Sequence, residues 1–188
     1  MKALFFFVTL VGLSAFAQAS APVNEDHVVP TDATRALIIE MSIPAPLPEV
    51  WRAFTTKEGL SSWLAPDVSV DLRSGGDWLV MFPGSTAGGT IVSFVPKKEL
   101  VISALAPDRF PHVRAARTRA VFTFTANGNN TLVRLSQTGW QQGKEWDDAY
   151  EYLAAGNAEI LSMLHHRYVA GPANWGKMTP PAAKPTGK

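Results

Sequence analysis

The feature that most constrains this fold is the segment spanning residues 50–78, VWRAFTTKEGLSSWLAPDVSVDLRSGGDW. Its second half alternates, with Val68, Val70 and Leu72 on one parity, as in a strand with one buried face. Gly75-Gly76 then permits a tight reversal, because glycine reaches positive φ without a Cβ clash. Its first half spaces apolar residues as two brief helical turns would, namely Val50, Trp51, Phe54, Leu60, Trp63 and Leu64. The segment predicts two short helices and a hairpin, the beginning of a container-shaped fold.

The N-terminal residues 1–19 resemble a secretory signal peptide. One lysine precedes an apolar run over residues 3–13, and small residues in Ala-x-Ala spacing follow it. Cleavage after Ala17 or Ala19 fits this spacing best. The apolar run is shorter than the roughly 20 residues that span a bilayer, so a cleaved signal is favoured over an anchor. We expect a periplasmic or secreted protein without stable membrane insertion, in which residues 20–33 form a leader.

The bulk composition excludes some classes of partner. The 188 residues carry 17 basic and 16 acidic side chains, and no strongly basic stripe that could follow a nucleic-acid backbone. Nucleic acid is therefore not an expected partner. There is no cysteine, so no disulfide strengthens the fold, and its stability must come from its core.

The sequence pattern of the whole chain predicts strands, two short helices and one long helix. A period of three to four residues predicts a six-turn amphipathic helix that ends at Gly171-Pro172, and residues 171–188 are expected to form a flexible tail. Its stripe consists of Trp146, Tyr150, Leu153, Asn157, Ile160, Leu164 and Tyr168. Short helices are expected over 47–55 and 57–64. Strands are expected over 35–43, 67–72, 77–82, 89–95, 100–105, 118–125 and 131–138.

This order of elements resembles the START-like superfamily of helix-grip proteins, and within it the group named after the activator of Hsp90 ATPase. The resemblance covers residues 34–170. It implies an α+β fold in which a curved antiparallel sheet of about seven strands, with two short helices after the first strand, wraps a long C-terminal helix. The residues that carry it are Val50, Trp51, Ala53, Phe54, Thr55, Leu60, Trp63, Pro66, Asp71, Arg73, Gly75, Gly76 and Trp78, with weaker matches at Gly89, Thr90, Ile91, Phe122, Phe124, Thr131, Leu132 and Gly156.

Two features depart from that family. The family often has Gly-Trp where this chain has Gly156-Asn157, which places a polar amide on the stripe expected to face the cavity. An exported protein would also not meet a cytosolic chaperone, so Hsp90 is not an expected partner.

Such a fold implies a ligand cavity between the sheet and the long helix. The candidate lining consists of large apolar groups whose parities could face inward, namely Trp51, Trp63, Trp78, Phe82, Phe94, Phe124, Tyr150 and Leu153. Ordinary core packing is the alternative for each of them. Asn157 and Gln137 are candidate polar contacts, because a buried amide needs a partner. That partner could be a ligand or water, a backbone carbonyl, or solvent.

Residues 107–117 predict a long loop that is rich in cations. It could form a cationic lid, in which arginines pair with an acidic head group while a phenylalanine closes over an alkyl tail. A solvated basic loop is the alternative. The lid residues would be Arg109, Phe110, His112, Arg114 and Arg117.

Signs of catalysis are few. His165 and His166 are adjacent and so point about 100° apart on a helix, and no metalloprotease or nucleophile motif is present. The favoured interpretation is an exported protein that binds a small apolar or amphipathic molecule without cofactor or metal. A cyclase- or hydrolase-like enzyme using Glu40, Asp71 or His112 is the alternative, and a protein-interaction module is the third.

Overall fold

The structure, a computed structural model, describes residues 35–82 and 85–178. The expected signal peptide and leader lie outside the described residues. The elements in chain order are β1 (Leu37–Ile43), α1 (Leu47–Thr55), α2 (Lys57–Ser61), β2 (Val68–Val70), β3 (Asp77–Phe82), β4 (Ser85–Val95), β5 (Glu99–Leu105), α3 (Pro111–Ala116), β6 (Thr118–Asn127), β7 (Asn130–Thr138), α4 (Lys144–Ala170) and α5 (Trp175–Met178).

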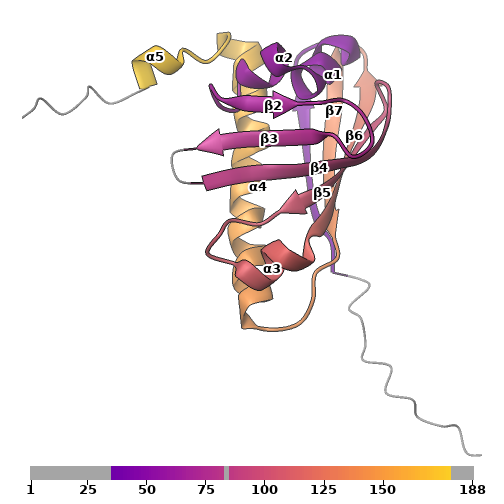
Figure 1. The fold of residues 1–188 in the computed structure, drawn as a ribbon. Helices are drawn as coiled ribbons and strands as arrows, with labels where there is room; N and C mark the ends of the chain where they lie inside the picture. The colour runs from indigo at the N-terminus through magenta and orange to yellow at the C-terminus, as the bar shows by residue number, and fades with distance from the viewer. Residues whose placement is uncertain (1–34, 83–84, 179–188) are drawn as a thin grey trace, which may run out of the picture.

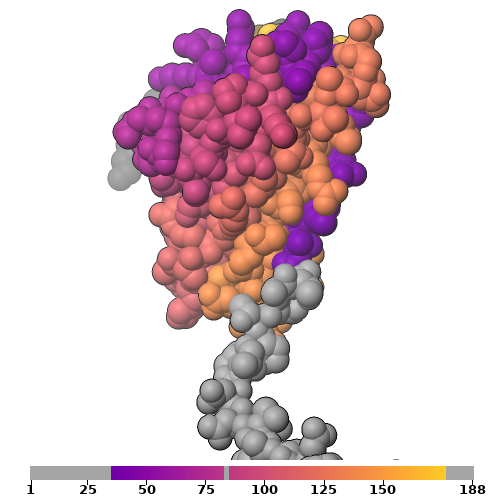
Figure 2. Space-filling view, turned by 90° about the vertical axis from the view of Figure 1, so that its right-hand side faces the viewer, coloured from indigo at the N-terminus to yellow at the C-terminus, as the bar shows by residue number. Residues whose placement is uncertain are grey.

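The strands form a single antiparallel sheet in the order β1-β7-β6-β5-β4-β3-β2. The sheet curves around α4, which runs along one of its faces, while α1 and α2 cover one end (Figure 1). The predicted α+β helix-grip architecture is therefore confirmed. Figure 2 shows β1, in indigo, beside orange residues along one edge of the molecule, where β1 pairs with β7.

The double glycine forms the reversal between β2 and β3. Gly75 has φ of 79°, a conformation that a residue with a Cβ rarely adopts. A Cβ on Gly76 would lie 2.1 Å from the carbonyl oxygen of Asp71, so this position admits no side chain. Val70 then pairs with Trp78 across the hairpin, as the alternating pattern predicted.

The two short helices follow from local signals. Pro46 precedes α1 in an extended conformation, and Pro48 lies in the first turn, where proline is tolerated because the N–H that it lacks would have no partner within the helix. Thr56 separates α1 from α2 and caps the second, since its Oγ1 accepts a hydrogen bond of 2.9 Å from the Gly59 backbone N–H. A Cβ on Gly59 would lie 2.1 Å from the carbonyl oxygen of Arg52. The two helices can therefore approach closely only with glycine there.

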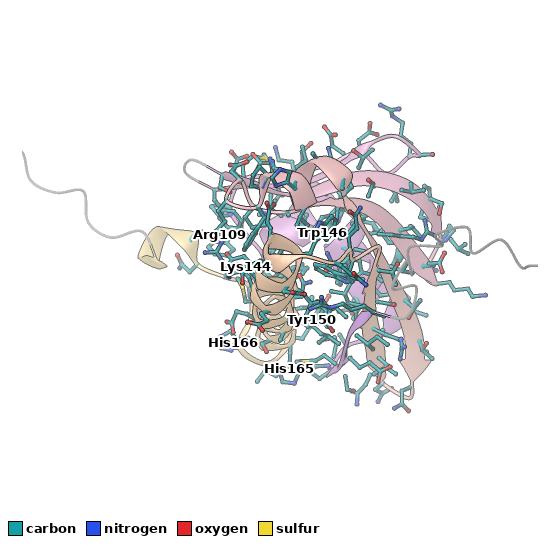
Figure 3. The ribbon with its side chains drawn as sticks, turned by 90° about the horizontal axis from the view of Figure 1, so that it is seen from below. Arg109, Lys144, Trp146, Tyr150, His165 and His166 are labelled. Carbon is teal, nitrogen blue, oxygen red and sulfur yellow. The ribbon has the colours of Figure 1, made fainter. Side chains whose placement is uncertain are left out.

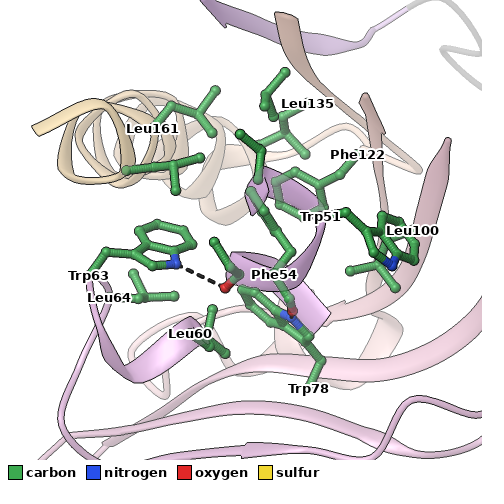
Figure 4. Packing of buried hydrophobic residues seen from close by; sticks show 14 of the residues in the cluster. Trp51, Phe54, Leu60, Trp63, Leu64, Trp78, Leu100, Phe122, Leu135 and Leu161 are labelled. Atoms are coloured by element: carbon green, nitrogen blue, oxygen red, sulfur yellow. Dashed lines mark hydrogen bonds between the residues drawn. The ribbon is translucent and has the colours of Figure 1, made fainter. Parts of the chain in front are cut away.

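The main core lies between α1, α2 and the sheet, and Phe54 is its centre (Figure 4). Its ring contacts Trp63, Trp78, Phe122 and Phe124 at centroid distances of 5.0 to 6.5 Å. The two indoles also fix the helix backbone. Trp63 Nε1 donates to the Ala53 carbonyl at 3.0 Å, and Trp78 Nε1 donates to the Phe54 carbonyl at 2.8 Å. These buried aromatic groups stabilise the fold through apolar burial while their polar atoms stay satisfied.

A second apolar cluster lies under the first turns of α4. Trp146 and Tyr150 pack edge-on against Trp140, at 6.5 and 5.0 Å between ring centroids. Phe110 and Val113 are buried in the same cluster and bring α3 against the start of α4. The long helix is therefore held by separate apolar contacts along its length.

Two segments differ from their sequence-based expectations. The expected loop over 107–117 contains the helix α3, because Pro111 suits a helix start and Val113 supplies a buried anchor. The expected flexible tail begins as ordered chain. The Ala173 N–H donates to the Ser62 carbonyl at 2.9 Å, and Trp175 Nε1 donates to the Ser61 carbonyl at 2.7 Å. These bonds hold the residues after α4 against α2.

Candidate functional site: a cavity between the sheet and helix α4

A cavity of about 260 Å³ lies between the sheet and the middle of α4. This volume is slightly below the roughly 300–1,000 Å³ of pockets that hold drug-sized ligands. The lining is predominantly apolar, and several of its residues are small. It consists of Trp78, Phe82, Ala87, Gly88, Ile102, Ala104, Leu105, Pro107, Ala120, Phe122, Leu135, Gln137, Tyr152, Leu153, Gly156, Asn157 and Ile160.

Gly156 contributes to this space from the helix. It lies in the interior of α4, and a Cβ built on it would have no heavy atom within 4 Å. Glycine in a helix interior costs about 1 kcal/mol relative to alanine. The structure shows no steric reason for this cost, unlike at Gly59. The consequence of the missing side chain is open volume inside the cavity.

One chain of hydrogen bonds supplies the polar part of the lining. Asn157 Nδ2 donates to Gln137 Oε1 at 2.8 Å, and Gln137 Nε2 donates to Thr118 Oγ1 at 2.7 Å. Gln137 and Thr118 are buried, so this chain satisfies groups that water cannot reach. No partner for Asn157 Oδ1 is found among the described residues. Asn157 thus presents an amide to the cavity.

The cavity opens where two of its lining residues are exposed. Phe82, at the end of β3, keeps 46% of its surface accessible, and Tyr152 of α4 keeps 44%. Arg109 lies beside this opening, with its guanidinium carbon 3.7 Å from the centroid of the Tyr152 ring. The mouth therefore combines aromatic surface with a cation.

The ten predicted cavity residues divide into two groups. Those at the cavity are Trp78, Phe82, Gln137, Leu153 and Asn157. The others lie outside its lining. Trp51 and Phe124 pack edge-on in the main core at 5.3 Å, Phe94 packs against that core, and Trp63 is buried there.

Tyr150 is the last of these and faces away from the cavity. Two residues along a helix rotate the side chain by about 200°, so Tyr150 and Tyr152 lie on opposite sides of α4. Tyr150 packs on Trp140, and its hydroxyl donates to the Ala36 carbonyl at 3.3 Å. Figure 3, viewed from the α3 end, shows Tyr150 and Arg109 on different sides of the helix.

The predicted lid residues are mostly engaged with the body of the protein. Arg114 Nε pairs with Asp108 at 2.9 Å, and its Nη1 donates to the Ala106 carbonyl. Arg117 Nη1 donates to the Ser103 carbonyl at 3.4 Å. Phe110 is buried under α4.

His112, the fifth predicted lid residue, belongs to a polar contact between α3 and α4. Its Nδ1 lies 2.5 Å from Glu145 Oε2, while the backbone N–H groups of His112 and Val113 donate to Glu145 Oε1 at 2.8 and 3.2 Å. The hydrogen bond from His112 is the main reason why the pKa of Glu145 lies below its ordinary value. Of the five lid residues, this leaves Arg109 beside the mouth.

The residues considered for catalysis are dispersed. Glu40 pairs with Arg134 at 2.6 Å, and Asp71 pairs with Arg73 at 2.7 Å. Neither acid lines the cavity, and Tyr152 is the one titratable side chain in its lining as described. No group of three or more metal-ligating side chains occurs within residues 35–82 and 85–178. The cavity can therefore offer shape, apolar contact and hydrogen bonds.

Two larger hollows are grooves on the surface. One, of about 490 Å³, lies between α1, α2 and the end of α4, where burial raises the pKa of Tyr168. The other, of about 630 Å³, lies between the second half of α4 and the segment that follows it, and His165 and His166 line it. Both are less apolar in their lining than the cavity. None of the helices in the described residues is long and apolar enough to cross a membrane.

The sequence analysis did not identify the small residues of the lining, nor Phe122 and Leu135. Ala87, Ala104 and Ala120 create space where larger residues would fill it. Phe122 and Leu135 could have been found, because they share the strand parity of Phe124 and Gln137, respectively.

Comparison with known proteins places this geometry in a family. The solution structure of the Aha1 dimer from Colwellia psychrerythraea has a TM-score of 0.62 at 20% identity, covering 73% of this chain and 98% of that chain. Protein MLL2253 from Mesorhizobium loti has a TM-score of 0.60 at 20% identity, covering 70% and 95%. CalU16 from Micromonospora echinospora has a TM-score of 0.55 at 21% identity, covering 77% and 80%. At such identities the likeness concerns the fold.

No curated protein matches the chain. A family model described as Activator of Hsp90 ATPase homolog 1-like protein matches residues 44–167, which begin directly after β1 and include the strands β2 to β7 and most of α4. Because this match covers well over half of the sequence, the chain belongs to the family of Activator of Hsp90 ATPase homolog 1-like proteins.

Proposed function

We propose that this protein is exported and binds a small apolar or amphipathic molecule in the cavity between its sheet and α4. The observation that carries the proposal is Gly156. A helix-interior glycine with no neighbour around its absent Cβ lowers helix stability and leaves volume in the cavity. Binding a ligand is the use that explains why the space is kept.

The lining suits such a ligand. Ile102, Leu135 and Ile160 offer apolar contact, and the Asn157 amide offers one polar anchor. A few polar groups placed in a mostly apolar pocket are typical of small-molecule sites. The acids considered for an enzyme lie outside this lining, so acid–base catalysis has no pair of groups here to support it.

Export rests on the first 19 residues, whose charge, apolar run and small residues have the pattern of a cleaved signal. An exported chain has no access to cytosolic Hsp90, and the proposal therefore assigns no chaperone role. Intact-mass measurement on protein from the extracytoplasmic fraction should give an N-terminus at Gln18 or Ser20. A chain that still begins at Met1 would contradict export.

Ligand binding is tested by native mass spectrometry of protein purified from its own host, followed by extraction of bound small molecules. We expect a bound species that is retained by the wild-type chain. In the Gly156→Leu variant it should be lost, because the leucine side chain would occupy the cavity. Ala158→Leu is the matched control, since Ala158 is exposed on the same helix. Equal recovery from both variants would place the ligand elsewhere.

The stability of Gly156→Leu shows whether it loses the ligand because the cavity is filled or because the protein unfolds. Replacing a helix-interior glycine should raise the free energy of unfolding by about 1 kcal/mol. Gly156→Leu should therefore be more stable than wild type in urea while it loses the ligand. A variant that loses the ligand because it is destabilised would show the opposite change in stability.

A further inference from the structure

The mouth of the cavity carries a cation whose charge no neighbouring acid balances. Arg109 lies in the turn between β5 and α3, over the ring of Tyr152 at 3.7 Å and near that of Phe110 at 4.8 Å. Among the described residues it has no carboxylate oxygen within 4 Å. Stacking on a ring orients the guanidinium plane and leaves its N–H edge available.

Three acids in the first two turns of α4 are paired with other residues. Glu145 contacts His112 at 2.5 Å, Asp147 pairs with Arg35 at 2.5 Å, and Asp148 pairs with Lys144 at 2.8 Å. In Figure 3 Lys144 lies at the start of α4, on the side of the helix where Arg109 is found. Asp108, next in sequence to Arg109, pairs with Arg114. These pairings leave Arg109 as a cation that a ligand could neutralise.

Arg109 lies next to residues that line the cavity. Tyr152, on which the guanidinium stacks, is itself part of the lining, and so is Pro107 of the same turn. An anion at Arg109 would thus stand at the opening while an attached apolar body extends toward Ile102 and Leu135. Planar guanidinium and carboxylate groups can form two parallel hydrogen bonds.

We propose that Arg109 makes the cavity selective for acidic amphiphiles, with a carboxylate bound at the guanidinium and the apolar body inside. This inference rests on the proposed function, because it needs a ligand in the cavity. It narrows the ligand to a small carboxylic acid whose body is an alkyl chain or an aromatic ring.

The experiment compares probes that share one tail and differ in head group. Octanoate, 1-octanol and octylamine are titrated calorimetrically into the full chain at neutral pH. Octanoate should bind about fivefold more tightly than octanol, the scale of a partly exposed ion pair, and octylamine should bind most weakly. Parallel titration with 2-naphthoate distinguishes an aromatic body from an alkyl one.

Two variants of Arg109 test whether this residue causes the preference for octanoate over octanol. Arg109→Gln should remove the advantage of octanoate over octanol, and Arg109→Lys should restore part of it because the charge returns without the planar fork. Arg52→Gln is the matched control, since Arg52 is an exposed arginine on α1 outside the cavity lining. It should leave the preference unchanged.

The outcomes separate this inference from the function on which it rests. If octanol and octanoate bind equally, or if Arg109→Gln keeps the preference, the head-group assignment is overturned. Octanol binding that disappears in Gly156→Leu would still support the cavity as the ligand site in that case. Absence of binding by every probe would contradict both proposals.

Discussion

At the scale of single residues, the site depends on two amides and one hydroxyl. Gln137 accepts from Asn157 and donates to Thr118, so each group satisfies another that is shielded from water. The cost of removing one member is mainly the cost of leaving its partner unpaired. Asn157 is the member that reaches the cavity.

Substituting both amides together should cost less free energy of unfolding than the sum of the two single substitutions. We expect Gln137→Leu and Asn157→Leu each to lower the free energy of unfolding, by about 1–3 kcal/mol for the former. In Gln137→Leu both Asn157 and Thr118 lose a partner, whereas in the double variant Asn157 no longer needs one. Urea unfolding of the four proteins should show a double variant more stable than the sum of the single effects predicts. Strict additivity would contradict a coupled chain.

At the residue scale, the structure places the predicted polar residues at the cavity and several of the predicted aromatic residues in the core. Asn157 and Gln137 stand out because an amide at an apolar parity needs a partner, and the structure pairs them with each other. Large aromatic residues carry no such signal. Trp51 and Phe124 fill space in the core, while alanines and Gly156 create the void. A cavity forms where side chains do not fill the space between elements, and the hydrophobic pattern of a sequence does not predict where that happens.

At the scale of elements, the contact between α3 and α4 depends on ionisation. Glu145, in the first turn of α4, accepts hydrogen bonds from the α3 backbone and from His112. Because these interactions favour the carboxylate, the pKa of Glu145 is lower in the folded chain than its ordinary value of 4.5. Its contribution to stability is therefore present above that value and is lost as the pH falls through the folded pKa.

Glu145→Gln should test this contact. At neutral pH the variant should unfold at lower urea concentration than wild type, and the gap should close as the pH is lowered below 4.5. Glu151→Gln is a control with the same charge change on the same helix. Its difference in urea midpoint from wild type should not close as the pH falls below 4.5. A Glu145→Gln gap that is constant with pH would show that the carboxylate does not hold α3.

Most elements could be predicted because their signals are local. β3 and α1 have the bounds that alternation and helical spacing predicted, and the double glycine marks the reversal between β2 and β3. The two segments that were not predicted depend on contacts with residues distant in the sequence. α3 depends on burial of Val113 beneath α4, and the segment after Gly171 is held by carbonyls of Ser61 and Ser62 from the other half of the chain. Neither partner is visible in the local sequence.

At the scale of the whole molecule, two apolar clusters flank the cavity. One joins α1 and α2 to the sheet, and the other holds the first turns of α4 and α3. The middle of α4 spans the interval between them, where Gly156 and the small strand residues leave space. The fold is thus stabilised at both ends of the helix and can keep an unfilled centre. Family membership accounts for the architecture, and these particular residues account for the cavity.

The most direct measurement of this account locates a ligand inside the molecule. Isotope-filtered nuclear Overhauser spectra of the labelled chain with unlabelled octanol should show contacts from the alkyl chain to Trp78, Ile102 and Leu153, all in the cavity lining. They should vanish in Gly156→Leu and persist in Ala158→Leu. Contacts confined to Trp63 and His165 would place the ligand in the surface groove behind α4 and contradict the account.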